Sequence, residues 1–151
     1  MRIAFDSNIL VYFADGRVVP GDAAKIEQAQ DLYLKLLKVA DLFAPIQALG
    51  EALHVMVRKS GFSSQKIDTM FEQWLVGFSP LPTEVTTLRS ALSIVRDHGL
   101  QHWDSVIIAA SSEAECAILL SEDMQHGFVW RGLTVINPFA DDPHPLLASL
   151  L

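Results

Sequence analysis

The stretch that most constrains this chain covers residues 101–123, QHWDSVIIAASSEAECAILLSED. Residues 106–110 are apolar on every side of a helix, and a helix of that kind must be buried. About one helix length later, residues 117–120 form a short apolar run that is typical of a fully buried strand. A buried helix that leads into a buried strand favours an α/β protein with a parallel sheet.

The remainder of the chain continues the same alternation of short apolar runs and amphipathic stretches. We predict strands at 3–5, 42–44, 78–81 and 133–136, and helices at 9–14, 22–40, 46–59, 63–78 and 83–98. Asp22 is expected to cap the second helix, Thr83 with Thr86 to open the fifth, and Gly99 to end it. The pattern predicts a three-layer α/β/α sandwich around a short central parallel sheet.

Length and hydropathy indicate one domain with a sizeable core. The chain has 151 residues, of which 50% are hydrophobic, and we expect the domain to span residues 1–139, followed by a Pro-interrupted tail at 140–151. No apolar run reaches the roughly 18 residues of a membrane span. A charge at Asp6 comes too early for a signal peptide, so we expect a cytoplasmic protein with no membrane partner. Cys116, the single cysteine, is expected to be a buried thiol.

Net charge by itself argues against a nucleic-acid partner. Eleven Lys and Arg residues stand against 18 Asp and Glu residues, which gives −7. An acidic chain repels phosphate at long range and lacks the basic footprint of most nucleic-acid binders. Binding to nucleic acid therefore requires a local device, and metal ions held by clustered acids are one.

Acidic residues occur at positions from which they can meet in one crevice. Asp6 and Asp123 each follow a predicted strand, and Asp104 lies at the start of the buried helix. In an open parallel sheet, ligands bind beyond the carboxyl ends of the strands. Glu51 can join them if its helix crosses that edge of the sheet, because its helical neighbours are smaller and less polar than those of a solvated face.

Each acid also has a simpler explanation. Asp6 is a suitable helix N-cap, and a single Glu on a helix is most often solvated. If the acids do converge, two unpaired carboxylates about 4 Å apart repel by about 4 kcal/mol at an effective dielectric constant near 20. Such a cluster needs cations, and hard oxygen ligands without His or Cys suit Mg²⁺ or Mn²⁺.

Four segments in this order resemble the PIN-domain nucleases, and most closely the VapC-type toxin ribonucleases of bacterial toxin–antitoxin pairs. They are Asp6-Ser7-Asn8 after the first strand, the 47–51 segment QALGE, the 102–105 segment HWDS, and the 121–124 segment SEDM followed by Asn137-Pro138-Phe139. The similarity extends from residue 1 to about 139. None of the motifs is specific alone, whereas their order and spacing together are.

The resemblance implies an α/β/α sandwich, an RNA substrate, Mg²⁺ or Mn²⁺ as cofactor, a homodimer and a cognate antitoxin. Its metal-binding and catalytic acids correspond to Asp6, Glu51, Asp104 and Asp123. It gives Ser7, Asn8 and Ser121 supporting hydrogen-bonding or substrate-binding roles. Many relatives carry a further acid shortly after the last one, where this chain has Gln125, His126 and Gly127, so a second metal is not implied.

Other functions remain open from sequence. The same fold can serve as a non-catalytic module that binds RNA or protein. An aspartyl-phosphate phosphatase also uses an Asp after the first strand, but it needs a second Asp where this chain has Asn8. His98 and His102 are four residues apart, yet Gly99 interrupts the helix between them and no Cys lies nearby, so surface histidines are favoured over a zinc site.

Overall fold

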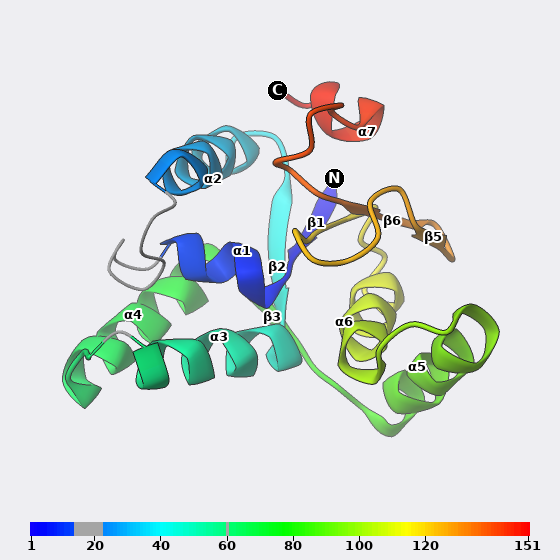
Figure 1. Cartoon of the computed structure of the whole chain (residues 1–151), viewed down its shortest axis with the longest axis horizontal. Coiled ribbons are helices and arrows are strands. Elements are labelled where there is room, and N and C mark those ends of the chain that lie inside the picture. Colours follow the sequence, from blue (N-terminus) through cyan, green and yellow to red (C-terminus); the bar gives the residue numbers. More distant parts are fainter. Residues whose placement is uncertain (14–22, 60) are drawn as a thin grey trace.

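A computed structural model describes residues 1–13, 23–59 and 61–151 and shows a central sheet surrounded by helices (Figure 1). The sheet has six strands in the order β3-β2-β1-β4-β6-β5. The strands are β1 (Arg2–Phe5), β2 (Asp41–Pro45), β3 (Ser79–Leu81), β4 (Ile118–Leu120), β5 (Val129–Trp130) and β6 (Leu133–Ile136). The fold is an α/β/α sandwich, as the alternation of the sequence predicted.

Helices connect the strands and cover the sheet. They are α1 (Ser7–Leu10), continued by the 3-10 turn η1 (Val11–Phe13), α2 (Ala23–Leu36), α3 (Ile46–Lys59), α4 (Ser64–Gly77), α5 (Val85–His98), α6 (His102–Glu113) and α7 (Pro145–Ala148). In Figure 1, α5 lies beside α6, and α1 lies above α3. Both α3 and α6 also contact β2.

The sheet departs from an all-parallel arrangement at one edge. Strand β5 runs antiparallel to β6, with Trp130 opposite Leu133. Arg131 and Gly132, which join these strands, both have positive φ angles, 45° and 87°. This geometry suits a two-residue hairpin turn, but Arg-Gly is a weaker signal than Asn-Gly. No strand was predicted between residues 120 and 133, and this two-residue strand was missed for that reason.

The buried helix and strand of the sequence prediction form the core. Every residue of α6 from Ser105 to Ser111 is buried, and all of β4 is fully buried. Burial raises the pKa of the Cys116 thiol to about 11, so this thiol stays protonated at neutral pH. Within the described residues, no helix combines the length and apolar character needed to cross a bilayer.

Several helix boundaries differ from the predictions for local reasons. Helix α1 begins at Ser7, because the Asp6 carboxylate caps it and accepts a bond from the Ser7 amide. Helix α5 begins after Glu84, which forms a capping box with Thr87, so the prediction that Thr83 and Thr86 open it was wrong. Gly99 ends α5 in the left-handed conformation, as expected.

The second helix ends earlier than its apolar stripe suggested. Helix α2 stops at Leu36, and the predicted residues 37–40 form a turn before β2. Asp22, the expected cap of this helix, and residue 14, the predicted end of the first helix, lie outside the described residues.

Chain topology brings two strand ends together at the centre of the sheet. From β1 the chain moves to β2 and β3 on one side, then returns to form β4 on the other side of β1. Strands β1 and β4 are parallel neighbours, with Phe5 paired with Leu120. Their carboxyl ends therefore share the topological switch point, which is where open α/β sheets bind ligands.

Candidate functional site

Asp6 follows β1 at this switch point and is held from several directions. Its backbone amide donates to the Leu120 carbonyl of β4 over 2.9 Å. Its Oδ1 accepts from the Ser7 amide at 2.6 Å, and its Oδ2 accepts from the Ser121 hydroxyl at 2.7 Å and from Asn8 Nδ2 at 3.0 Å. The residue is 4% exposed. Asp6 is thus both the N-cap that the simpler interpretation predicted and a buried carboxylate.

Burial raises the pKa of Asp6 from 3.8 to about 6. Hydrogen bonds from Ser121 and Ser7 lower it in part, whereas the negative charges of Glu51 and Asp104 raise it further. Because the effects that raise this pKa outweigh those that lower it, the site disfavours the charged form of Asp6 in the absence of a cation.

Glu51 reaches the same crevice from α3. Its Oε1 accepts from Gln47 Nε2 at 2.8 Å, one turn earlier on the helix, and its Oε2 accepts from the Ser7 hydroxyl at 3.2 Å. The side chain is half-buried. Because α3 packs against α1, a residue 44 positions along the chain from Ser7 meets the loop after β1. Glu51 therefore does not lie on a solvated face.

Asp104 and Asp123 meet at the opposite wall of the crevice. Asp104 lies in the first turn of α6, and Asp123 lies three residues after β4. Both line one cavity of about 130 Å³ with Met124, Gln125 and Phe128 among its other walls. Burial, and then the charges of Glu51 and Asp123, raise the pKa of Asp104. Asp104 is thus close to the charges of Glu51 and Asp123, and Asp6 is close to those of Glu51 and Asp104.

This set of carboxylates has no cationic partner in the described part of the chain, where the ion pairs involve other acids. Its donors are all oxygen, which fits a hard divalent cation such as Mg²⁺ or Mn²⁺. In the described residues, no three acidic, His or Cys side chains are yet grouped as the shell of one ion. Because Asp6 and Glu51 are held by hydrogen bonds, metal binding would require Asp104 and Asp123 to turn toward them.

Asn8 and Ser121 connect the two strand ends. Asn8 Nδ2 donates to Asp6 and, at 3.3 Å, to the Ser121 hydroxyl, while its Oδ1 accepts from the Glu122 amide at 3.2 Å. The Ser121 hydroxyl also accepts from the Met124 amide at 3.3 Å. These bonds join the loop after β1 to the loop after β4, so the polar residues beside Asp6 have partners in the site itself.

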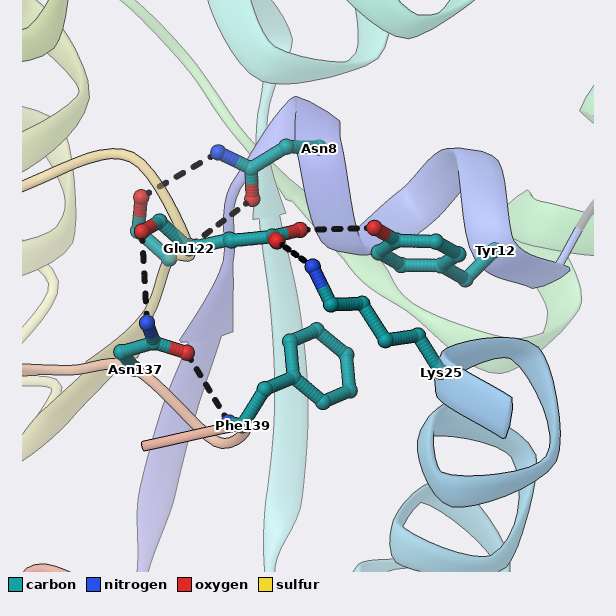
Figure 2. A network of polar contacts seen from close by, with 7 residues as sticks. Asn8, Tyr12, Lys25, Glu122, Asn137 and Phe139 are labelled. Carbon is teal, nitrogen blue, oxygen red and sulfur yellow. Dashed lines mark hydrogen bonds and ion pairs between the residues drawn. The ribbon is translucent and has the colours of Figure 1, made fainter. Parts of the chain in front are cut away.

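A second polar cluster beside these acids was missed from the sequence. The Glu122 carboxylate contacts Tyr12 of η1 and Lys25 of α2, far from it along the chain (Figure 2). Neither Tyr12 nor Lys25 belongs to a motif. The sequence therefore carries no signal for this cluster.

His98, His102 and His126 have partners of their own, and Gln125 adds no carboxylate to the site. His98 contacts the Phe128 ring edge-on, and His102 contacts Trp103 in the same way. His126 Nδ1 accepts from the Asn137 amide at 3.0 Å. Gln125 lines the cavity of Asp104 and Asp123, so an amide stands where a further acid would lie.

The chain is similar to proteins of one known family. The family model described as the PIN domain matches residues 3–127. No curated protein matches the sequence. Among solved structures, VapC20 of Mycobacterium tuberculosis, a sarcin–ricin loop cleaving toxin, is 15% identical with a TM-score of 0.63, covering 78% of this chain and 86% of that one.

Two further similar structures are complexes. A toxin–antitoxin complex from Klebsiella pneumoniae is 14% identical with a TM-score of 0.65, covering 91% of this chain and 98% of that one. FitAB bound to the IR36 DNA fragment is 16% identical with a TM-score of 0.65, covering 94% and 99%. At these identities the likeness is one of fold.

Proposed function

The chain belongs to the PIN-domain family, and on this premise we propose that it is a metal-dependent endoribonuclease. One observation carries the proposal, which is that four carboxylates from separate parts of the chain lie near the switch point of the sheet, two of them bonded to Ser7 and two lining one cavity. They are Asp6, Glu51, Asp104 and Asp123. A cluster of like charges at a ligand-binding edge suits a centre that is completed by a cation.

Asp6, Glu51, Asp104 and Asp123 would hold Mg²⁺ or Mn²⁺. A bound divalent ion supplies Lewis-acid stabilisation of phosphate charge and a more acidic water. Asp6 is fixed by Ser121, Asn8 and the Ser7 amide, so its carboxylate has one orientation in the crevice. The Ser7 hydroxyl and Gln47 orient Glu51 in the same way. No side-chain nucleophile is needed, which agrees with a site of carboxylates, amides and hydroxyls.

An acidic protein that cleaves RNA needs its own charge neutralised locally. The chain carries −7 overall, and an unmatched acidic site repels the phosphate backbone. Cations in the crevice reverse that repulsion where the substrate must bind. This dependence makes removal of metal a strong test of the function.

We also propose that the protein is the toxin of a toxin–antitoxin pair and forms a homodimer. Two of the similar structures are a toxin–antitoxin complex and FitAB on DNA, which supports an antitoxin as the protein partner. Helix α5 exposes Val85, Leu88 and Leu92 at helical spacing, an apolar stripe that suits self-association. Light scattering on the purified chain measures the dimer, and a monomer at high micromolar concentration contradicts it.

RNA cleavage with and without metal tests the nuclease. Wild-type protein is expected to cut single-stranded or loop RNA with Mn²⁺ or Mg²⁺ and to lose this activity in EDTA. Asp104→Asn should lower the rate by roughly 100-fold or more, because even residues that only support a metal ligand cost about 10- to 100-fold. Asp31→Asn is the control, since Asp31 pairs with Lys35 on the exposed face of α2. Cleavage that persists in EDTA, or equal rates for Asp104→Asn and wild type, contradicts the proposal.

A further inference from the structure

Glu122 lies between two residues of the acidic site, and its side chain is directed to a different part of the protein. Ser121, on one side, donates to Asp6, and Asp123, on the other, lines the same cavity as Asp104. Figure 2 shows the Glu122 carboxylate reaching away toward η1 and α2. The residue therefore connects the loop after β4 to elements that are not part of the acidic site.

Both oxygens of the Glu122 carboxylate are occupied. Oε2 accepts from the Tyr12 hydroxyl at 2.7 Å, and Oε1 forms an ion pair with Lys25. The Glu122 side chain is 21% exposed and that of Lys25 is 32% exposed, so this pair is shielded from solvent more than a surface pair is. Tyr12 is buried and comes from η1, directly after the helix that Asp6 caps.

The turn after β6 completes this cluster (Figure 2). Asn137 donates to the Glu122 carbonyl over 3.4 Å, and the Phe139 amide donates to Asn137 Oδ1 over 2.9 Å. The Phe139 and Tyr12 rings meet edge-on, with 5.4 Å between their centroids. The Lys25 ammonium lies 5.6 Å from the centroid of the Phe139 ring. With the Asn8 bond to its amide, Glu122 is held through its amide, its carbonyl and its side chain.

Asp123 has no comparable support of its own. Its side chain is exposed and makes no hydrogen bond or ion pair with the described residues. The residues on either side of it are fixed, however, because Glu122 is held as above and Met124 is buried with its amide bonded to Ser121. The direction of Asp123 is thus determined by its neighbours in the chain.

We propose that Glu122 is a positioning residue, which through Tyr12, Lys25 and Asn137 holds Asp123 beside the cavity that it lines together with Asp104. The inference rests on the proposed metal-dependent function. A site that must gather its carboxylates around a cation binds it more tightly when the least supported carboxylate is already placed. Glu122 supplies that preorganisation from outside the acidic crevice, because its carboxylate is directed toward Lys25 and Tyr12.

Titration calorimetry with Mn²⁺ tests the role apart from catalysis. Glu122→Ala is expected to weaken Mn²⁺ binding by roughly tenfold, the lower range for residues that orient metal ligands. Glu122→Gln keeps an oxygen that can accept from Tyr12 but loses the charge that pairs with Lys25. Its affinity for Mn²⁺ should therefore lie between those of wild type and Glu122→Ala. In RNA cleavage, Glu122→Ala should need a higher Mn²⁺ concentration for its half-maximal rate, while KM for RNA at saturating Mn²⁺ changes little.

Glu113→Ala is the matched control. Glu113 also accepts two side-chain hydrogen bonds, from Thr87 at 2.7 Å and Ser90 at 2.9 Å. It lies nine residues after Asp104 on α6, about 13 Å along the helix axis. Its loss removes comparable bonds away from the crevice, so the Mn²⁺ affinity of Glu113→Ala should equal that of wild type.

The outcomes separate this inference from the proposed function. Wild-type protein that binds no Mn²⁺ overturns both. Wild-type protein that binds Mn²⁺, with Glu122→Ala equal to it or Glu113→Ala equally weakened, overturns only the positioning role. If Glu122→Ala does not fold, Tyr12→Phe decides, because it removes one hydroxyl and keeps the ring against Phe139; unchanged Mn²⁺ affinity in that variant overturns the inference.

Discussion

The two sides of the loop after β4 treat negative charge in opposite ways. On the crevice side, Asp6, Asp104 and Glu51 act on one another without a cationic partner in the described residues. On the other side, one residue away from Asp123, the Glu122 carboxylate has both an ammonium group and a phenol. The same short segment thus carries an unbalanced and a balanced carboxylate environment.

The two sides of the loop therefore have opposite effects on the stability of the fold. Like charges brought together in a partly buried crevice lower the stability of the metal-free fold, whereas a paired carboxylate between three elements holds the chain in place. Residues kept for function commonly store such a cost, and structural contacts nearby offset it. Measurements of stability without substrate can therefore distinguish the two sides.

The largest expected effect concerns Asp6 and pH. Its pKa rises from 3.8 to about 6 on folding, so the folded protein binds the extra proton over this interval. Stability linked to protonated Asp6 is complete below pH 3.8 and is lost as pH rises through about 6, a change of roughly 3 kcal/mol. In EDTA, the free energy of unfolding of wild type relative to Asp6→Asn should fall by this amount between pH 3 and pH 8.

Urea unfolding at a series of pH values measures this difference. The Asn side chain does not titrate, so the variant carries the same pH dependence from every other group. Mn²⁺ should reduce the difference at neutral pH, because a bound cation favours the charged carboxylate. Parallel curves for the two proteins in EDTA would show that Asp6 is not under strain from burial and its acidic neighbours.

A smaller change in the stability of the metal-free protein is expected for a substitution at Asp104. Burial and the charges of Glu51 and Asp123 raise its pKa, so its charged form is disfavoured in the fold even though it faces a helix N-terminus. Asp104→Asn should stabilise the metal-free protein at pH 7 by roughly 1–2 kcal/mol, allowing for solvent screening of a half-exposed group. The melting temperature in EDTA should rise by a few degrees.

The same variant should lose most of the stabilisation that Mn²⁺ confers on wild type. At 100 times the dissociation constant, a ligand that binds only the folded state adds about 2.7 kcal/mol. Thermal melts of both proteins, with Mn²⁺ and with EDTA, show the two effects together. A variant that melts lower than wild type in EDTA would identify Asp104 as an ordinary first-turn aspartate.

The crevice side of this comparison could be predicted from sequence, because its residues follow general rules. Apolar runs at 3–5 and 117–120 predict buried strands, and polar residues directly after such strands meet at one edge of a parallel sheet. Asp6, Ser121 and Asp123 follow from that rule alone. Glu51 could be included only because its helical neighbours are unusually small. Its position beside Ser7 results from the packing of α3 against α1.

The other side could not be predicted, because its partners share no local pattern. Tyr12 and Lys25 meet Glu122 only after η1 and α2 have packed beside the strand ends, more than 90 residues away in the chain. A lone Lys in the first turn of an amphipathic helix is most often solvated. The missed strand β5 has the same origin, since a two-residue strand is defined by its partner β6 and not by its own sequence.

The smallest expected effect compares two lysines of α2. Lys25 pairs with Glu122 in a partly buried setting, with side chains 32% and 21% exposed, whereas Lys35 pairs with Asp31 one turn away at 47% and 62%. Lys35→Met should change the free energy of unfolding by at most about 0.5 kcal/mol, the usual value of an exposed pair. Lys25→Met should cost about 1 kcal/mol more, because it leaves a shielded carboxylate with the Tyr12 hydroxyl and removes an ammonium from the Phe139 ring.

Urea unfolding at pH 7 in low and high salt measures both, and salt should weaken the Lys35 pair more than the Lys25 pair. Equal losses for the two variants would place Glu122 among ordinary surface acids and remove the contrast between the two sides of the loop.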